Sequence, residues 1–364
     1  MNLAFVTSYL TIKGGRERFI LEVVKRLVNR GITTKIFCQA FNPNTTFSEF
    51  KNLPVESLNS RTHLIGKFAA YFGLKNMKEL VLKAERWGAD IIFLQSGYIF
   101  GDYLQKYAKK PIISYSHDVL ESFGAKNSSM VRDLYRRILG ISESKVVKLE
   151  HVPIICNSDY TAKLLKEQYP EANVICVVHP GVNLEKFKPK WADQGYLFYH
   201  SRFEPRKNQK LLIEIAANFN YSLILAGYLD EKNEHYYNYL VKNATSNVTI
   251  LKNLADEEIL SYLQNCSVFL FPAIGEFFGL TVLEAMACGK PVIVLDSGAP
   301  PELIGGAGYV CKDDLKDWIA KTEALMANKT LRKRLGKKAC EVAQKYSWEN
   351  TVSNLEKIFY SYAH

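Results

Sequence analysis

Two glutamates eight positions apart, Glu276 and Glu284, flank the start of a segment that predicts a short helix. The helix is expected over residues 280–288, and a buried strand follows at residues 291–295. Most other side chains of the helix are apolar or small, so a carboxylate there is costly unless a polar group pairs with it. The vicinal hydroxyls of a sugar suit this purpose, because an ionised carboxylate accepts two hydrogen bonds at once. The free backbone N–H groups at the helix start, after Gly279, could also bind a phosphate.

Both glutamates also have an ordinary structural explanation. Thr281 and Glu284 have the spacing of a capping box, in which Glu284 would bond only the backbone at the helix start, and Glu276 could be a solvated loop residue. The wider sequence favours a binding site. Residues 276–293, with residues 298–302 after them, closely resemble the donor-site signature of the retaining glycosyltransferases of family 4. The resemblance implies that Glu276 contacts the transferred sugar and Glu284 the donor ribose, and that the donor also lies against Phe278, Gly279, Leu280 and Thr281.

Two cations follow the first strand expected in the second half of the chain. Arg202 and Lys207 could neutralise the charge that builds on a diphosphate as a glycosidic bond breaks. An isolated pair of this kind is often only a solvated basic loop. In the resembled family, however, the diphosphate-binding arginine and lysine stand at these places, with Arg206 as a competitor for the lysine. The chain has no Asp-x-Asp triplet, with which glycosyltransferases of the other main architecture hold a metal ion, so we expect no metal and no cofactor.

Three residues of the first half follow strands in the same way. Gly14 and Gly15 lie between the first strand and the first helix, where adjacent glycines permit positive φ and a close approach of the backbone to a ligand. A plain tight turn would explain them equally well. The resembled family places this loop against the donor phosphates and the acceptor. His117 follows a later strand, where the family has a histidine close to the transferred sugar, although a lone histidine is more often structural. We group His117 with Glu276 and the two cations as expected catalytic residues, in contact with the sugar or acceptor rather than as a base.

Weaker signals come from three other segments. Asn253 and Leu254 occupy the loop that in the family holds the nucleotide base through its backbone, so donor contacts are expected there. Residues 180–183 match the family's interdomain Pro-Gly-Val-Asp, with Asn183 in place of the aspartate. Glu302 keeps its family position, where it is expected to support the residues that contact the donor.

Both halves of the chain alternate short apolar strands with helices, which predicts two parallel sheets covered on both faces. In the first half, strands are expected near residues 3–7, 34–38, 90–95, 111–116, 153–156 and 174–178, and helices near 16–30 and 159–168. In the second half, strands are expected near residues 196–200, 221–226, 248–251, 267–271 and 291–295, and helices near 208–218, 233–243, 256–264 and 280–288. From about residue 313 the chain is expected to be helical, with a last helix at 347–360.

The alternation predicts an α/β protein, and the resemblance implies the GT-B arrangement. In this arrangement two Rossmann-like domains face each other across a cleft, and the C-terminal helix crosses back to the first domain. The acceptor-binding domain is expected at residues 1–184 with 347–364, and the nucleotide-sugar donor domain at residues 185–346. Ligands of parallel sheets bind beyond the carboxyl ends of the strands, which places both substrates in the cleft.

The charge distribution indicates the kind of partner, and the use of cysteine indicates the cellular compartment. The 364 residues carry a net charge of +10, which belongs to the first half: residues 1–190 have a charge of +11 and the remainder −1. This excess predicts an anionic partner for the first domain. No apolar run is long enough to span a membrane, and the N-terminus lacks the organisation of a secretion signal. The seven cysteines are scattered singly, as in reducing compartments, so a cytoplasmic protein is expected.

Residues 61–86 combine apolar and basic side chains at helical spacing. Leu64, Phe68, Tyr71 and Phe72 would share one face with lysines close by, as in helices that lie on a membrane surface. The same aromatic residues could instead pack into the domain core. The first interpretation predicts peripheral association with an anionic membrane surface, at its inner face.

The sequence leaves three functions open. The resemblance covers nearly the whole chain and implies transfer of a sugar from a UDP- or GDP-linked donor to a glycan or lipid-linked acceptor. A nucleotide-sugar epimerase of the same architecture would need no acceptor. A non-catalytic binder of nucleotide sugars or nucleic acid would suit the basic first half. The aromatic residues are not interleaved with basic ones as on RNA-binding sheets, so no nucleic-acid partner is expected.

Overall fold

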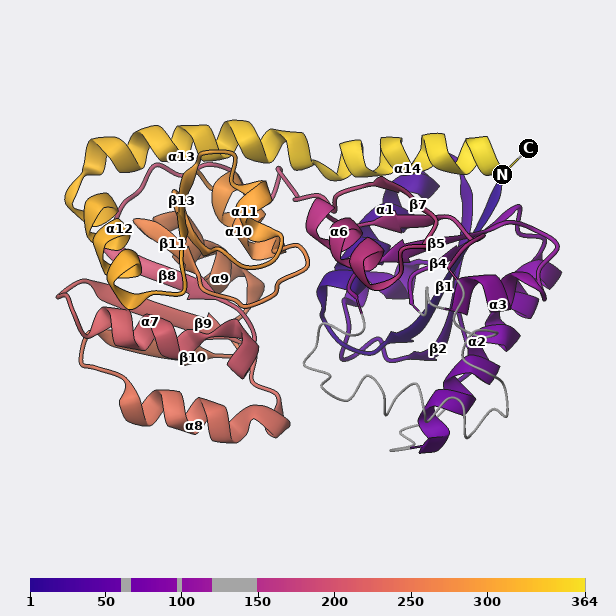
Figure 1. Cartoon of the computed structure of the whole chain (residues 1–364), viewed down its shortest axis with the longest axis horizontal. Helices are drawn as coiled ribbons and strands as arrows, with labels where there is room; N and C mark the ends of the chain where they lie inside the picture. Colours follow the sequence, from indigo (N-terminus) through magenta and orange to yellow (C-terminus); the bar gives the residue numbers. More distant parts are fainter. Residues whose placement is uncertain (60–66, 97–99, 120–148, 364) are drawn as a thin grey trace. The chain divides into compact units, whose positions relative to one another are not determined.

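The computed structural model describes residues 1–59, 67–96, 100–119 and 149–363. The chain divides into two compact units, the first made of Met1–Pro180 and Trp348–His364 and the second of Gly181–Ser347. Each unit contains one parallel sheet with helices packed against it (Figure 1). The predicted α/β class with two Rossmann-like domains is therefore confirmed. The placement of the two domains across a cleft stays a prediction.

The sheet of the first unit has the strand order β3-β2-β1-β4-β5-β6-β7, and its pairings are parallel. Its strands are β1 (Asn2–Leu10), β2 (Thr33–Phe41), β3 (Val55–Ser57), β4 (Ile91–Leu94), β5 (Ile112–Ser116), β6 (Ile154–Cys156) and β7 (Val174–Val177). β4 and β5 are buried along their whole length, as expected for central strands of a parallel sheet. The strand order reverses between β1 and β4, and such a switch point is where open parallel sheets bind ligands.

The C-terminal helix belongs to the first unit. The helices described in this unit are α1 (Gly15–Asn29), α2 (Lys67–Trp87), α3 (Gly101–Gln105), α6 (Asp159–Gln168) and α14 (Trp348–Tyr362). In Figure 1, α14 lies along α1. Arg26 of α1 donates to Glu349 of α14 and Arg30, which directly follows α1, donates to Glu356, each at 2.7 Å. The prediction that the last helix returns to the first domain is confirmed.

The second unit repeats the architecture with the strand order β10-β9-β8-β11-β12-β13, again parallel throughout. Its strands are β8 (Tyr196–His200), β9 (Ser222–Gly227), β10 (Val248–Lys252), β11 (Val268–Phe271), β12 (Val292–Leu295) and β13 (Gly308–Cys311). Its α-helices are α7 (Gln209–Ala216), α8 (Glu234–Asn243), α9 (Asp256–Asn265), α10 (Leu280–Ala287), α11 (Pro300–Leu303), α12 (Leu315–Ala327) and α13 (Lys329–Ala343). The switch point of this sheet lies between β8 and β11.

The predicted strands and most predicted helices are confirmed within a few residues, but two strands were missed. β3 has three residues, too few to show an alternating pattern. β13 begins at Gly308, where any side chain would collide with the backbone of Val292 on the neighbouring strand. The residue is thus selected by the close approach of two strands rather than by strand propensity. Across the described ranges, no helix combines the length and apolar composition that a bilayer span requires.

Candidate active site

Two loops of the second unit meet at its switch point. One follows β8 and carries Arg202 and the 3₁₀ turn Pro205–Lys207; the other follows β11 and carries Glu276. The ammonium group of Lys207 contacts the carboxylate of Glu276, and Arg206 Nη1 lies 3.7 Å from the same carboxylate oxygen. The structure thus brings together a lysine and a glutamate that two separate motifs had indicated.

The cations keep Glu276 ionised. Burial alone would raise the pKa of its carboxyl group, but the charges of Lys207 and Arg206, the hydrogen bond from Lys207 and the charge of Arg202 together lower that pKa below its ordinary value. Lys207 is only 8% exposed. Each member of the pair therefore depends on the other to offset desolvation. A buried lysine can stabilise a diphosphate, and a carboxylate beside it can accept hydrogen bonds from sugar hydroxyls.

Arg202 occupies a different part of the same loop. Its side chain is 48% exposed and pairs with Glu204 at 3.4 Å rather than with Glu276. Its backbone is fixed by Gln209, whose side-chain nitrogen donates to Arg202 O at 2.7 Å and to Ser201 Oγ at 2.9 Å. Gln209 was not among the predicted residues, because a glutamine at a helix start carries no distinctive sequence signal. Arg202 is thus an accessible cation on a well-anchored loop.

The start of α10 differs from the capping-box alternative. The N-cap residue is Gly279, with φ of 103°, and no side chain caps the helix. Thr281 lies two positions too late to be the cap, so the capping-box interpretation is wrong. The partly exposed residues of α10 are Leu280, Thr281 and Glu284, which share one face, while the rest of the helix is buried. This face carries Glu284, which is predicted to bind the donor ribose. The backbone N–H groups at the start of α10 have no side-chain cap.

Phe278 contributes to the site differently from its neighbours. Its side chain is buried and its ring meets that of Tyr346 edge-on, with 6.5 Å between the ring centroids. The side chain therefore belongs to the domain core, and a contact of Phe278 with a donor would have to come from its backbone.

Residues after β12 hold the Glu276 loop in place. Ser297 Oγ accepts from Gly275 N at 2.9 Å, and Ala299 N donates to Glu276 O at 2.8 Å. Between them, Gly298 forms an isolated parallel bridge with Glu276. Gly298 has φ of 80°, and an added Cβ would lie 2.6 Å from the backbone nitrogen of Glu276. Only glycine satisfies both requirements, so this position fixes where the carboxylate of Glu276 stands.

We expect Gly298→Ala to lower turnover on the order of a hundredfold, because the collision displaces the Glu276 loop and a shift of about 1 Å has this cost. The matched control is Gly306→Ala, at φ of 79° with no atom within 4 Å of an added Cβ. Both variants lose about 1–2 kcal/mol of stability from the left-handed conformation. Thermal denaturation and steady-state kinetics measure the two effects. Equal turnover in the two variants would contradict the positioning role of Gly298.

Asn253 and Leu254 lie apart from the Glu276 cluster, in the loop after β10. Asn253 is left-handed with φ of 56°; its backbone N–H donates to Gly227 O at 2.8 Å and its side chain accepts from Leu229 N at 3.1 Å. It therefore joins the loops that follow β9 and β10 at the carboxyl edge of the sheet. Leu254 is partly buried against the core. A nucleotide base at this edge would meet the loop backbone, as the resemblance implies.

The interdomain segment shows what Asn183 does in place of an aspartate. Its Oδ1 accepts from the backbone N–H of Glu185 at 3.1 Å and of Lys186 at 3.0 Å. An aspartate could accept the same bonds, so the replacement changes the charge of the segment and not its turn.

The predicted residues of the first unit follow β1 and β5, at the carboxyl edge of its sheet. Gly14 is the N-cap of α1, and Gly15 is the exposed first residue of that helix. Gly14 does not use the positive φ that glycine permits, since it is extended with φ of −124°. A Cβ at Gly14 would press on a carboxylate oxygen of Glu17, so the end of that side chain would have to move to admit another residue. Next to them, Arg16 Nη1 donates to Ser96 Oγ, in the loop after β4, at 3.2 Å.

His117 follows β5 and is held from several sides. Its Nε2 lies 3.1 Å from Gln95 Oε1, and its carbonyl oxygen accepts from Asn157 Nδ2 at 2.9 Å. The ring of Phe19 meets it edge-on at 5.1 Å between centroids. Burial, assisted by the positive charge of Arg16, holds the pKa of His117 well below its usual 6.5. The imidazole is therefore neutral at physiological pH, able to donate and accept hydrogen bonds but carrying no charge.

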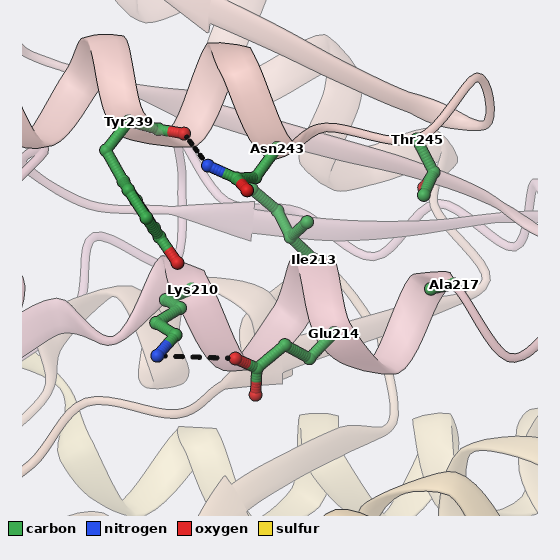
Figure 2. A pocket seen from close by; sticks show the side chains of 7 residues that line it. All are labelled: Lys210, Ile213, Glu214, Ala217, Tyr239, Asn243 and Thr245. Carbon is green, nitrogen blue, oxygen red and sulfur yellow. Dashed lines mark hydrogen bonds and ion pairs between the residues drawn. The ribbon is translucent and has the colours of Figure 1, made fainter.

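The groove between α7 and α8 is separate from these residues. It has a volume of about 210 Å³ and is lined by the residues that Figure 2 labels, among them Lys210 and Glu214, which pair at 3.5 Å. Asn243 in turn donates to Tyr239 O at 2.7 Å. None of the predicted site residues lines this groove.

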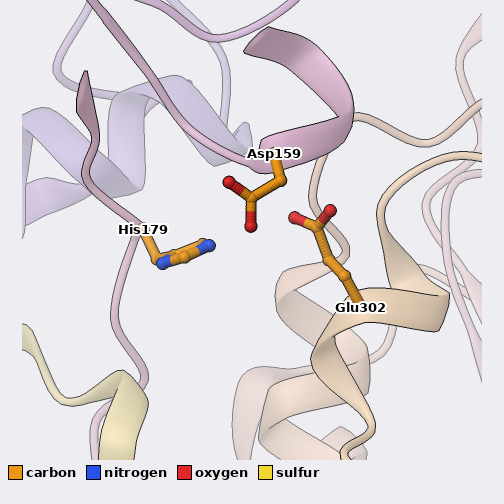
Figure 3. A group of neighbouring side chains, drawn as sticks. All are labelled: Asp159, His179 and Glu302. Carbon is orange, nitrogen blue, oxygen red and sulfur yellow. The ribbon is translucent and has the colours of Figure 1, made fainter. Parts of the chain in front are cut away.

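Figure 3 shows three further polar side chains, which come from both units. Asp159 opens α6 and His179 follows β7 in the first unit, while Glu302 lies on α11 of the second unit. Burial lowers the pKa of His179, and the nearby charge of Asp159 opposes this in part. Metal ions in proteins are ordinarily held by three or more protein ligands, so the two residues of the first unit do not by themselves make a metal site.

Two family models match the chain and together span residues 13–342. The model described as Glycosyltransferase Family 4 matches residues 13–186, and the one described as Glycosyl transferases group 1 matches residues 182–342. The chain belongs to glycosyltransferase family 4. The second match contains the Glu276 and Lys207 loops, and the first contains Gly14 and His117.

Individual proteins similar to this glycosyltransferase cover it to different extents. The alpha-1,3/1,6-mannosyltransferase ALG2 of Homo sapiens is 27% identical over 385 residues, which cover 94% of this chain and 92% of that protein. An uncharacterized glycosyltransferase of Methanocaldococcus jannaschii is 33% identical over 211 residues, and that match spans 57% of this chain and only 58% of its relative. Among solved structures, Anabaena HepE in complex with UDP and glucose has a TM-score of 0.78 at 20% identity, covering 99% of this chain and 100% of its own. This last likeness shows the fold.

Proposed function

We propose that this glycosyltransferase moves a sugar from a UDP- or GDP-linked donor to a glycan or lipid-linked acceptor, with retention of the anomeric configuration and without a metal ion. The observation that carries the proposal is the pairing of Lys207 with Glu276 at the switch point of the second unit. The pair stands where a diphosphate and the sugar attached to it would need a cation and a carboxylate next to each other. The carboxylate is ionised without a metal ion, because neighbouring cations compensate its charge.

The second unit supplies the donor site. Lys207 and Arg202 neutralise the diphosphate as the bond from the sugar C1 to the phosphate oxygen breaks. The uncapped N-terminus of α10 adds backbone N–H donors for the same phosphates. Glu276 holds the transferred sugar and Glu284 the ribose, while the backbone of Asn253 and Leu254 meets the base.

The first unit supplies the acceptor side. The loop of Gly14 and Gly15 lies against the phosphates and the acceptor, and His117 contacts the sugar or acceptor as a neutral imidazole. The acceptor oxygen forms the new bond to C1 as the bond from C1 to the phosphate breaks, and the hydroxyl proton passes to the departing diphosphate. The names of two similar proteins support the proposed transfer of a sugar from a nucleotide-linked donor: the human relative is a mannosyltransferase, and Anabaena HepE binds UDP and glucose.

The decisive experiment combines donor binding with product analysis. A thermal-shift panel of nucleotide diphosphates and their sugars identifies the donor, because a ligand of the native state raises the melting temperature. The donor is then incubated with candidate glycan and lipid-linked acceptors, with and without EDTA, and NMR of the product gives the anomeric configuration. We expect a retained configuration and full activity in EDTA. Interconversion of the donor without any acceptor would show an epimerase instead, and strict dependence on added Mg²⁺ or Mn²⁺ would contradict the metal-free site.

We further propose that helix α2 attaches the first unit to an anionic membrane surface from the cytoplasmic side. Leu64 and Ile65 lie outside the described residues, and the side chains of residues 67–73 are likewise not described. From residue 74 onward, α2 buries its apolar face in the domain core, formed by Leu74, Met77, Leu80, Val81 and Ala84. Leu74 therefore packs in the core and is not available to a membrane surface.

The surface next to this helix is basic and aromatic. Lys75 is exposed, and Lys78 Nζ lies 3.7 Å from the centre of the Tyr107 ring. The helical period of 3.6 residues puts Lys75 on the side opposite to the buried positions 77, 80 and 84. A basic side away from the core is part of what a surface-binding helix needs. All seven cysteines are free thiols, which supports a reducing, cytoplasmic compartment.

Co-sedimentation with vesicles tests the membrane proposal. We expect pelleting with anionic but not neutral vesicles, falling steeply with salt, because each basic side chain near the surface contributes roughly 1 kcal/mol. Lys75→Glu should weaken pelleting several-fold, whereas the matched control Lys316→Glu, an exposed lysine of the second unit, should not. Equal and negligible pelleting in every condition would favour a soluble acceptor.

A further inference from the structure

Gln95 is a buried amide with one unused hydrogen-bonding group. It directly follows β4, is 2% exposed, and its backbone N–H donates to Val6 O at 2.8 Å. Its side-chain oxygen lies 3.1 Å from His117 Nε2. Its side-chain nitrogen has no hydrogen-bond partner in the part of the chain that the structure describes. A buried N–H₂ group without a partner is costly, and such groups in native proteins call for an explanation.

The carboxamide oxygen of Gln95 determines the tautomer of His117. An amide oxygen can only accept, so the imidazole nitrogen facing it must carry the proton. With Nε2 protonated, Nδ1 of the neutral ring keeps its lone pair and can accept a hydrogen bond. The backbone of His117 is fixed independently by Asn157, at 2.9 Å. Gln95 thus orients the ring, and Asn157 the main chain.

The loop that carries Gln95 is itself anchored at the switch point of the first unit. The hydroxyl of Ser96 lies 3.1 Å from Thr7 Oγ1 of β1, accepts from Ser8 N at 3.2 Å and from Arg16 Nη1 at 3.2 Å. The loop that carries the Gln95 amide is therefore anchored to β1 and to Arg16 of α1, at the edge where open parallel sheets bind ligands. Rigid placement of an unsatisfied donor is the arrangement that recognises a hydroxyl or carbonyl oxygen with high discrimination.

We propose that Gln95 is a positioning residue of the acceptor side, which fixes His117 in the Nε2-protonated tautomer and donates its own amide N–H to a hydroxyl oxygen of the bound sugar or acceptor. The substrate part of this inference rests on the proposed function. The positioning part concerns the protein alone and can be measured without any substrate.

NMR and kinetics of two variants test the inference. Long-range ¹H–¹⁵N spectra of the whole chain, with His117 assigned through His117→Gln, should show Nε2 protonated in the wild type. In Gln95→Met, which keeps the length of the side chain, we expect the two tautomers to mix. Turnover should fall, or KM for the sugar-bearing substrate rise, on the order of tenfold. Gln95→Glu, the second variant, should place a carboxylate beside the ring and raise the pKa of His117, so that activity falls as the pH is lowered through that new value.

The charges around His117 make the pH experiment interpretable. Arg16, on α1, faces the ring and opposes its protonation, and it pairs with Glu17 at 3.2 Å. Neither residue is changed in the Gln95 variants. The matched control is Thr34→Val, since Thr34 Oγ1 is also buried without a hydrogen-bond partner among the described residues but lies near the amino end of β2. It should leave tautomer, turnover and KM unchanged.

An unaltered tautomer in Gln95→Met would overturn the positioning role, and unaltered kinetics with a mixed tautomer would overturn the substrate contact. A wild-type chain that transfers no sugar from any donor would count against the proposed function, while loss of the fixed tautomer would still support the role of Gln95 toward His117.

Discussion

Replacing Lys207 by alanine is expected to lower turnover on the order of a hundredfold, the scale seen when one donor that stabilises developing charge is removed. The diphosphate loses a cation that the fold holds in a buried position, where its charge is screened least. The variant should also lose stability, because Glu276 keeps only the weaker contact with Arg206 at 3.7 Å. The pKa of Glu276 should rise, and the acidic limb of the pH–rate profile should move to higher pH.

Arg202→Ala should lower turnover to a similar extent but leave the melting temperature unchanged, since Arg202 is 48% exposed and Glu204 keeps its second pair with Arg206 at 3.6 Å. Lys210→Ala is the matched control: this lysine is nearby in sequence and exposed, and it pairs with Glu214 on the surface. Steady-state kinetics at saturating donor and thermal denaturation separate the three variants. Wild-type turnover in Lys207→Ala, or an equal loss in Lys210→Ala, would refute the assignment of the leaving-group site.

The architecture could be predicted because its strands are short, apolar and buried on both faces. β8 and α6 have the bounds that the sequence indicated. Elements defined by tertiary contact were harder to predict. β13 depends on a glycine that admits a neighbouring strand, and β3 on three residues at a sheet edge. Hydrophobic periodicity carries no information about either requirement.

In the candidate site, too, several residues could be predicted from the sequence, but the contacts between them could not. Lys207 and Glu276 were both indicated by their motifs, but they are 69 positions apart and their direct pairing follows only from the adjacency of β8 and β11. The capping box failed because spacing alone does not reveal that Gly279 adopts a left-handed conformation and caps the helix. Gln95 was missed because a single glutamine after a strand is a common feature. Its unpaired amide and its contact with His117 become evident only in three dimensions.

The two glutamates that we propose for the donor site should affect different kinetic constants when each is replaced by alanine. Glu276→Ala is expected to reduce turnover on the order of a hundredfold with little change in donor KM, because the proposed site puts its carboxylate on the transferred sugar. Glu284→Ala should raise donor KM by roughly tenfold to a hundredfold, the cost of losing charged hydrogen bonds to the ribose. Initial rates over a matrix of donor and acceptor concentrations give both constants. Glu214→Ala, which removes an exposed carboxylate of α7, is the control and should change neither.

The acid stability of the protein gives an independent test of Glu276. Its folded pKa lies below the ordinary value of 4.5, so its contribution to stability is present above pH 4.5 and is lost as the pH falls through the lower folded value. Glu276→Gln, which keeps the shape of the side chain but leaves Lys207 without its carboxylate, should lower the melting temperature at pH 7. Relative to the wild type, the deficit should shrink as the pH is lowered below 4.5. If both alanine variants keep wild-type kinetics while remaining folded, and the deficit of Glu276→Gln is independent of pH, then neither glutamate holds the donor and the Lys207–Glu276 pair is only structural.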